Sequence, residues 1–224
     1  MQKDVYLIRG MESDSYDDFK QRIFSMVDIV KSQCDSVKLV LTEQKPPKIT
    51  VIPFRKSKIA AISVYYSKQT APIPSLLKSK GFAGMYKVME ALPVKYDKTW
   101  ADGEITPGVC LLTLFRKKKK LEYEKFLDRW HNGHTPLSLK IHPLWHYNRN
   151  VVEEEHTDNN DKFDGIVEEH CKTSSELFNP FKFFGNPLVI IPRMLQVYFD
   201  VNSFIDYPSI EPYLVSEYHI KSQF

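Results

Sequence analysis

One order of secondary-structure elements, strand–helix–strand–strand–helix–strand, is predicted twice along this chain of 224 residues. Runs of β-formers alternate with stretches whose apolar residues recur at helical spacing. In the first half the predicted strands cover residues 4–9, 37–42, 59–66 and 83–94, and the helices cover 16–33 and 75–80. In the second half the strands cover 109–115, 145–153, 163–170 and 213–220, with a helix over 118–140 and a proline-broken helix over 173–200. This is the order of the ferredoxin-like split unit.

Short sequence matches support an internal duplication. A Tyr-x-Val-x-Glu pattern closes each half, at 86–90 and 213–217, and a Tyr-x-x-Phe pattern opens the first helix of each, at 16–19 and 123–126. Both pairs fall at equivalent places in the element order. We therefore interpret the chain as a ferredoxin-like unit over 1–96, a linker over 97–108 and a second ferredoxin-like unit over 109–224.

The bare face of each predicted sheet determines how the two units should associate. A four-stranded antiparallel sheet with its helices on one side leaves an apolar surface on the other side. Two such sheets in one chain can cover each other. We predict an α+β fold of tandem ferredoxin-like units whose antiparallel sheets pack face to face as an intrachain pseudo-dimeric α+β barrel. Association of sheet edges or helix faces into a homodimer is a further expectation.

Composition narrows the class of protein. The chain is 42% hydrophobic, which is enough for a core, and its 31 Lys and Arg against 28 Asp and Glu give no reason to expect a nucleic-acid partner. No glycine-rich nucleotide motif is present, and the basic run at 116–120 is interpreted as a solvated loop. There is no apolar leader and no run long enough to span a bilayer, so we expect a cytoplasmic protein without membrane contact.

The second unit carries a set of short motifs in a fixed order. They are Trp-x-x-x-His-x-Pro-Leu at 130–137, His-Pro at 142–143, Tyr-x-x-Asn-x-Val at 147–152 and a tail with Glu-Leu-Phe at 176–178, Asp200, Phe204, Asp206 and Tyr-x-Val-x-Glu at 213–217. This set resembles the EthD-like members of the dimeric α+β barrel superfamily. The first unit lacks the tryptophan–histidine block, so it looks like a degenerate copy.

The resemblance implies a small barrel with a cleft between sheet and helices. Some members of the family are tied to ether degradation, and related barrels include polyketide cyclases, haem-degrading monooxygenases and chlorite dismutases. Such likeness at the level of the fold does not by itself assign a reaction.

His134 is the predicted catalytic residue. It ends an apolar helical stripe that should face the sheet, and a neutral imidazole there is suited to general acid–base catalysis near pH 7. The alternative is a satisfied, semi-buried histidine that fixes the turn at 135–136.

Five further residues are predicted to bind substrate. The aromatic ones would line a pocket, with ordinary barrel core as the alternative for each, and the amide would fix a ligand or hold a neighbouring backbone. They are Trp130, Trp145, Tyr147, Tyr86 and Asn150.

Four histidines, at positions 131, 134, 142 and 146, lie close together in sequence. Residues 142 and 146 have i, i+4 spacing, but Pro143 and the strand-like run after it argue against a helix there. Alternation along a strand would put Trp145 and Tyr147 on one face and His146 on the other. No carboxylate or cysteine stands out as a further ligand, so we predict no metal site. Haem with one axial histidine, by analogy with related barrels, remains an alternative.

The function expected from these residues is binding of a small, largely apolar or aromatic organic molecule. Acid–base conversion of a cyclase, isomerase or cofactor-free oxygenase type is the chemistry that His134 would support. Two other functions remain open: a non-enzymatic ligand-binding or stress-related barrel, and a haem-binding protein.

Overall fold

The computed structural model describes residues 1–68, 71–157 and 162–222. The first half forms β1 (Gln2–Arg9), α1 (Tyr16–Val30), β2 (Ser36–Leu41), β3 (Ile59–Tyr66), α2 (Pro74–Leu77) and β4 (Phe82–Val94). The second half begins with β5 (Val109–Phe115), α3 (Tyr123–Asp128), a π-helical turn (Arg129–His134), α4 (Thr135–Ile141), β6 (Leu144–His156) and β7 (Gly165–Cys171). It ends with α5 (Ser174–Phe178), α6 (Pro180–Phe183), α7 (Ile190–Phe204), a 3-10 turn (Tyr207–Ser209) and β8 (Glu211–Lys221).

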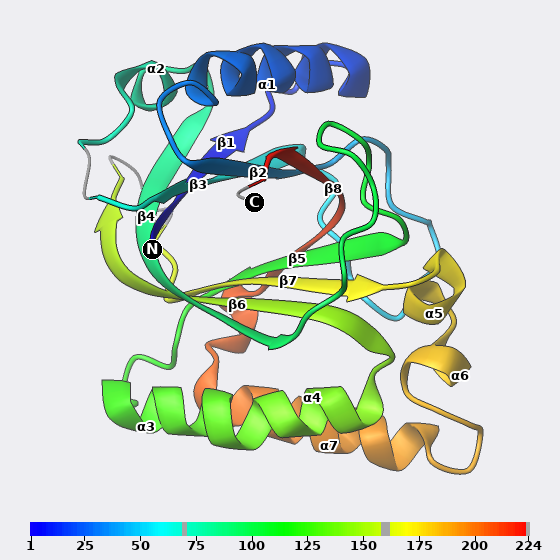
Figure 1. Cartoon of the computed structure of the whole chain (residues 1–224). Coiled ribbons are helices and arrows are strands. Elements are labelled where there is room, and N and C mark those ends of the chain that lie inside the picture. Colours follow the sequence, from blue (N-terminus) through cyan, green and yellow to red (C-terminus); the bar gives the residue numbers. More distant parts are fainter. Residues whose placement is uncertain (69–70, 158–161, 223–224) are drawn as a thin grey trace.

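The eight strands form one closed antiparallel barrel in the order β1-β3-β2-β8-β5-β7-β6-β4 (Figure 1). Within it, β4-β1-β3-β2 and β8-β5-β7-β6 have the same strand order. The predicted α+β fold, a pseudo-dimeric barrel within one chain, is confirmed. The two sheets also hydrogen-bond along both edges, at β2–β8 and β4–β6. Because this closure pairs every described strand edge, a homodimer, which stays a prediction, would have to form through helices or loops.

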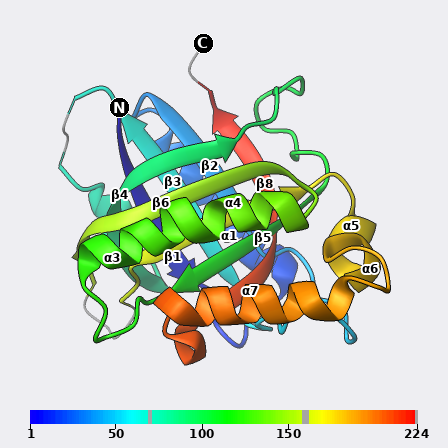
Figure 2. The same cartoon turned by 90° about the horizontal axis from the view of Figure 1, so that it is seen from below.

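α1 and α2 cover the outside of the first sheet, and α3, α4 and α7 cover the second. Figure 2 shows the α3–α4 rod and α7 side by side across the second sheet. α1 begins with a capping box, in which Ser15 and Asp18 each bond the other's backbone N–H. Its residues Phe19, Ile23 and Val27 are buried against the first sheet, so that interface is filled by helix side chains.

The helix predicted over 118–140 differs from the observed rod in two ways. It begins at Tyr123 rather than at residue 118, and its middle is a π-helical turn. Pro136 offers a physical reason: it has no N–H for an α-helical bond, and its ring would collide with the Asn132 carbonyl. A wider turn before the proline lets the rod continue, and in it the Thr135 N–H donates to the Trp130 carbonyl.

The broken helix predicted over 173–200 is observed as three helices. Pro180 lies in the first turn of α6 and Pro192 in the first turn of α7, where a missing N–H removes no intrahelical bond. Pro187 lies in the loop between them.

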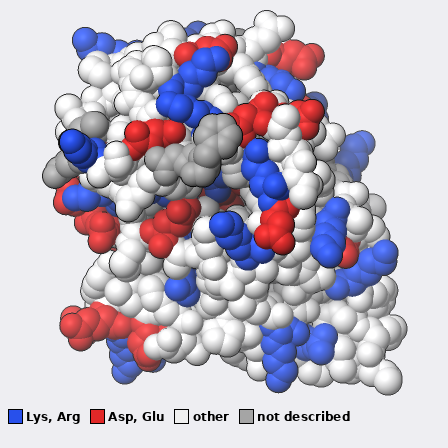
Figure 3. Space-filling view, viewed as in Figure 1, with Lys and Arg blue, Asp and Glu red and all other residues white. Residues whose placement is uncertain are grey.

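The surface combines charged and apolar regions. On the face of the molecule seen in Figure 3, Lys and Arg are interspersed with Asp and Glu, without a continuous region of one sign of charge. Several large apolar side chains of the α7 region are exposed, namely Leu188, Ile191, Leu195, Tyr198 and Phe199. Among the described residues, no helix is both long and apolar enough to cross a bilayer.

Candidate functional site

A cavity of about 450 Å³ lies between the second sheet and its helices. Its sheet side is formed by outward-facing residues of β5 and β7, including Thr113 and Glu169. Its helix side is formed by the π-helical turn, α4 and α7, and the loop around Ile52 from the first unit borders it. We call this space the cleft. Its position matches the cleft that the family resemblance implied.

Three cleft residues from the π-helical turn and α4 lie on one side of the rod. Trp130, His134 and Ser138 follow one another at intervals of four residues, and all three line the cleft. The Thr135 hydroxyl also donates to the Trp130 carbonyl, at 2.9 Å, which supplements the wide turn. Arg149 donates in turn to the Thr135 hydroxyl at 2.6 Å, so the turn is anchored to β6.

His134 is held by two hydrogen bonds. Its Nδ1 lies 2.6 Å from Asp200 Oδ2 on α7, and its Nε2 lies 3.0 Å from the Ser138 hydroxyl on α4. A carboxylate only accepts hydrogen bonds, so Nδ1 carries the proton and donates it to Asp200. Nε2 then accepts from the Ser138 hydroxyl. The His134 side chain is 13% exposed, so its ring is sheltered within the cleft.

Burial sets the protonation of other groups around the cleft. It raises the pKa of the Glu169 carboxyl, an effect that nearby His134 partly offsets. It also raises the pKa of Tyr147. Burial lowers the pKa of His142 to about 4, so this imidazole is neutral at pH 7 and hydrogen-bonds the Phe183 carbonyl at 3.0 Å. The cleft thus combines apolar walls with a few polar groups.

Of the six predicted site residues, the fold brings Trp130, His134 and Tyr147 together in the cleft. Trp145 lies at one end of the barrel instead, with its ring 5.1 Å from that of Tyr96. Its different position follows from the irregular pairing at the start of β6.

Asn150 and Tyr86 are inside the barrel rather than in the cleft. Asn150 donates to the Ile166 carbonyl at 3.0 Å and accepts from Lys3 at 2.7 Å, so both ends of its amide are hydrogen-bonded inside the barrel. Tyr86 is fully buried, and its ring lies 6.1 Å from that of Phe163.

Sequence reasoning assigned no role to three residues that the structure places around His134. Asp200 appeared only as part of the family-like tail, 66 positions after His134. Ser138 had a detectable signal, since it follows His134 by four residues on a predicted helix. Glu169 had none, because its approach to the cleft depends on how β7 pairs in the second sheet.

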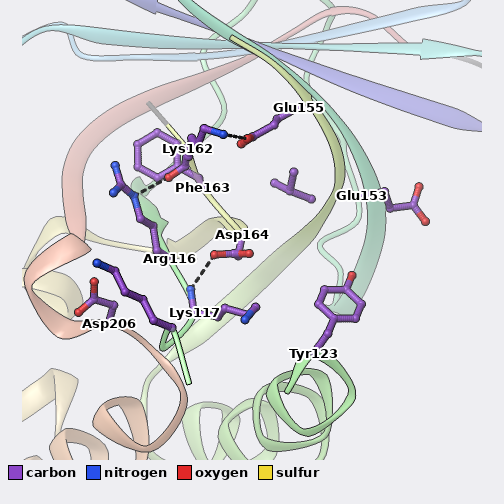
Figure 4. Close-up of a pocket in the computed structure, with 11 residues that line it drawn as sticks. Arg116, Lys117, Tyr123, Glu153, Glu155, Lys162, Phe163, Asp164 and Asp206 are labelled. Carbon is purple, nitrogen blue, oxygen red and sulfur yellow. Dashed lines mark hydrogen bonds and ion pairs between the residues drawn. The ribbon is translucent and has the colours of Figure 1, made fainter. Parts of the chain in front are cut away.

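A larger and more open hollow of about 790 Å³ lies where β5, β6 and the C-terminal end of α7 meet. Figure 4 shows Arg116, Glu155, Lys162 and Asp164 paired with each other or with nearby backbone, whereas Glu153 and Asp206 are drawn without such contacts. Lys162 lies 3.0 Å from Glu155, and the Lys117 N–H donates to Asp164 at 2.8 Å. Because these charges are paired at a solvated surface, we regard this hollow as a weaker candidate than the cleft.

Comparison with known proteins supports the fold. No protein-family model and no curated protein sequence matches the chain. A solved structure described as an anthrone oxidase-like protein matches with a TM-score of 0.59 at 9% sequence identity, over 100% of this chain and 95% of the other. The two proteins share a fold. Membership of the EthD-like family stays a prediction.

Proposed function

We propose that the cleft binds a small, flat, largely apolar molecule and that His134 transfers a proton to or from it. The cleft volume of about 450 Å³ is within the range of small-molecule sites, and its lining is mainly apolar with a few polar groups. The resemblance to EthD-like proteins supports the same ligand class. The single observation that carries the proposal is the chain of hydrogen bonds from Asp200 through His134 to Ser138.

This hydrogen-bonded chain has the polarity that a general base requires. Asp200 holds the Nδ1–H, which leaves Nε2 as the basic atom on the cleft side. A weakly acidic proton of the ligand would reach Nε2 directly after Ser138 rotates away, or through the Ser138 hydroxyl. The Asp200 carboxylate then stabilises the imidazolium that forms.

Cofactor-free oxygenation is the reaction we favour among the proton-transfer classes. The likeness to an anthrone oxidase-like protein supports a ring ketone with an acidic methylene group as the test substrate. Removal of one methylene proton by His134 would give an aromatic anion, which dioxygen converts to a carbonyl. One CH₂ and one O₂ give one C=O and one H₂O, and the proton on His134 leaves in the water.

The test compares His134→Ala with His156→Ala, which removes an exposed histidine outside the cleft. Binding of anthrone is followed by fluorescence, and turnover by oxygen uptake and product absorbance. We expect His134→Ala to lower kcat by about 10²–10⁴-fold, with ligand affinity changed much less, and His156→Ala to match wild type. Binding without turnover by the wild-type protein would contradict the enzymatic proposal and favour the non-enzymatic binder.

The same three residues have the arrangement of a serine hydrolase, which makes acyl transfer a second candidate. A Ser138 nucleophile would need donors for the developing oxyanion, and the backbone N–H of Ser138 lies inside a helix. For this reason we favour proton transfer. Covalent labelling of Ser138 by a fluorophosphonate probe, lost in Ser138→Ala, would reverse that preference.

Haem binding has less support from the structure. Both ring nitrogens of His134 are hydrogen-bonded, so an axial bond from Nε2 to iron would require it to lose Ser138. A Soret band that appears on haem addition and disappears in His134→Ala would establish this alternative.

A further inference from the structure

The interior of the barrel has a polar half that is separate from the cleft. Side chains alternate along each strand, so β5, β7 and β8 present one set outward to the cleft and another set inward. The inward set includes Glu168 and His170 on β7 and Glu217 on β8, with exposures of 0%, 1% and 1%. Their candidate ligand atoms all lie within 4.8 Å of one another.

Each of these three residues leaves one buried atom without a hydrogen bond. Among the described residues, Glu168 Oε1, His170 Nε2 and Glu217 Oε2 make no hydrogen bond of good geometry, although Glu217 Oε2 lies at ion-pair distance from His170 and Lys38. A buried polar atom that makes no hydrogen bond is unfavourable, and several such atoms in one cluster call for an explanation. His170 Nε2 and Glu217 Oε2 are 3.2 Å apart, close to the separation of about 3 Å expected for neighbouring ligands at 2.0–2.2 Å from one ion.

A second buried histidine, His146, lies next to this cluster and also has a ring nitrogen without a hydrogen bond in the described part of the chain. It lies on β6, is 4% exposed, and its Nδ1 also has no hydrogen-bond partner among the described residues. Its ring centroid is 5.3 Å from that of His170. A second imidazole with a free nitrogen therefore lies beside the cluster.

The surrounding groups orient Glu217. Its Oε1 accepts hydrogen bonds from the Tyr96 hydroxyl at 2.5 Å and from the Thr106 hydroxyl at 2.9 Å. This fixes the carboxylate and leaves Oε2 facing His170 and Lys38, at 3.2 Å and 3.3 Å. Outer hydrogen bonds of this kind position ligands in metal sites.

Charge in this half of the barrel favours an added cation. The ammonium groups and carboxylates here belong to Lys3, Lys38, Glu90, Glu168 and Glu217. Their formal charges leave one negative charge in excess, and an uncompensated buried charge is costly. A hollow at the barrel end, lined by Lys38 and His146 among others, offers a path for entry.

We propose that Glu168, His170 and Glu217 bind a divalent transition-metal ion, with His146 as a fourth ligand. Imidazole nitrogens mixed with carboxylate oxygens suit Zn²⁺, Fe²⁺ or Mn²⁺ better than Ca²⁺. The Lys38 ammonium is ion-paired with Glu168 and Glu217, so it competes with the metal for the same carboxylates. This site is independent of proton transfer in the cleft.

The experiment titrates the full, tag-free chain, after treatment with a chelator, with Zn²⁺ and with Co²⁺. Calorimetry gives the stoichiometry, and the Co²⁺ absorption spectrum reports nitrogen and oxygen ligands. We expect one equivalent per chain with a Kd tighter than about 10 µM. His170→Ala and Glu217→Gln should each weaken binding by at least about 100-fold, whereas the exposed His156→Ala should not. Weaker binding by the wild-type chain, or unchanged binding in folded His170→Ala, would overturn the proposal.

Lys38→Met provides a second test that keeps every proposed ligand. Removal of the competing ammonium should tighten metal binding by roughly tenfold or more. Equal or weaker binding in a folded Lys38→Met protein, compared with wild type, would show that no metal competes for these carboxylates.

Discussion

At the scale of single residues, Asp200 determines which ring nitrogen of His134 carries the proton. The carboxylate accepts the Nδ1–H and so leaves the basic Nε2 free to face Ser138. The two hydrogen bonds therefore fix the orientation of the His134 ring as well as its position. The bond to Asp200 also joins a residue of the rod and a residue 66 positions later in one hydrogen-bonded unit.

Asp200→Asn tests that dependence with little change in shape. The amide NH₂ can donate to Nδ1, which would move the imidazole proton to Nε2 and remove the base. We expect kcat to fall by about 10²–10⁴-fold, with ligand affinity nearly unchanged, in steady-state kinetics on the substrate used for His134→Ala. A variant that keeps wild-type kcat would show that Asp200 does not orient the ring.

The lowered pKa of Glu90 allows a prediction of how the stability of the barrel changes at acidic pH. Burial alone would raise its pKa, but the charges of Lys3 and Lys38 outweigh burial and lower the pKa to about 2. A lowered carboxyl pKa adds stability above the unfolded-state value of about 4.3, and this stability is lost as pH falls toward 2.

The measurement is the free energy of unfolding at pH 7 and pH 3. We expect Glu90→Gln to lower the free energy of unfolding at pH 7 by about 3 kcal/mol and to show a weaker loss of stability between the two pH values. The matched control is Glu154→Gln, which breaks an exposed ion pair with Lys87 and should change the free energy of unfolding much less. Equal effects of the two variants on the free energy of unfolding would show that the Glu90 carboxylate does not stabilise the barrel in this way.

At the scale of elements, the π-helical turn decides what the rod presents to the sheet. Residues four apart already lie on one side of an α-helix, as Trp130, His134 and Ser138 do, and the wider turn changes how far each is rotated about the rod axis. The sequence pattern predicted the helix, but a pattern based on 3.6 residues cannot reveal a local change of pitch.

Pro136→Ala should allow the turn to relax toward an α-helix, because residue 136 regains an N–H and loses the ring. We expect a melting temperature equal to or above that of wild type and a kcat at least about tenfold lower, since His134 would rotate relative to Asp200. Pro74→Ala, at the start of α2, is the control outside the cleft. Unchanged kcat in Pro136→Ala would mean that the proline is not what sets the turn.

At the scale of the whole molecule, the two halves depend on each other through two seams. β2 pairs with β8 and β4 pairs with β6, and the inner faces of both sheets share one interior. The predicted division at 1–96, 97–108 and 109–224 fits the repeated strand order but stays untested as a division into folding units.

A fragment of residues 109–224 would expose the edges of β6 and β8 together with an inner sheet face. We expect such a fragment to self-associate, because the strands of a second copy can pair with the exposed edges and its sheet can cover the exposed inner face. Light scattering coupled to size-exclusion chromatography measures this. A monomeric fragment with cooperative unfolding would show instead that the halves are independent units.

The sequence by itself determined the element order, the barrel and the helix stripe that carries Trp130 and His134. These features are local or periodic, and periodicity is visible in one dimension. Only the tertiary structure decided which distant residues meet. Asp200 reaches His134 because α7 packs beside α4, and Glu217 reaches His170 because β5 lies between β8 and β7. Pairing across a sheet or between helices depends on packing that single-sequence spacing does not encode, and the irregular pairing that moves Trp145 away from the cleft is of this kind. Asn150, by contrast, faces the barrel interior through the alternation of the strand itself.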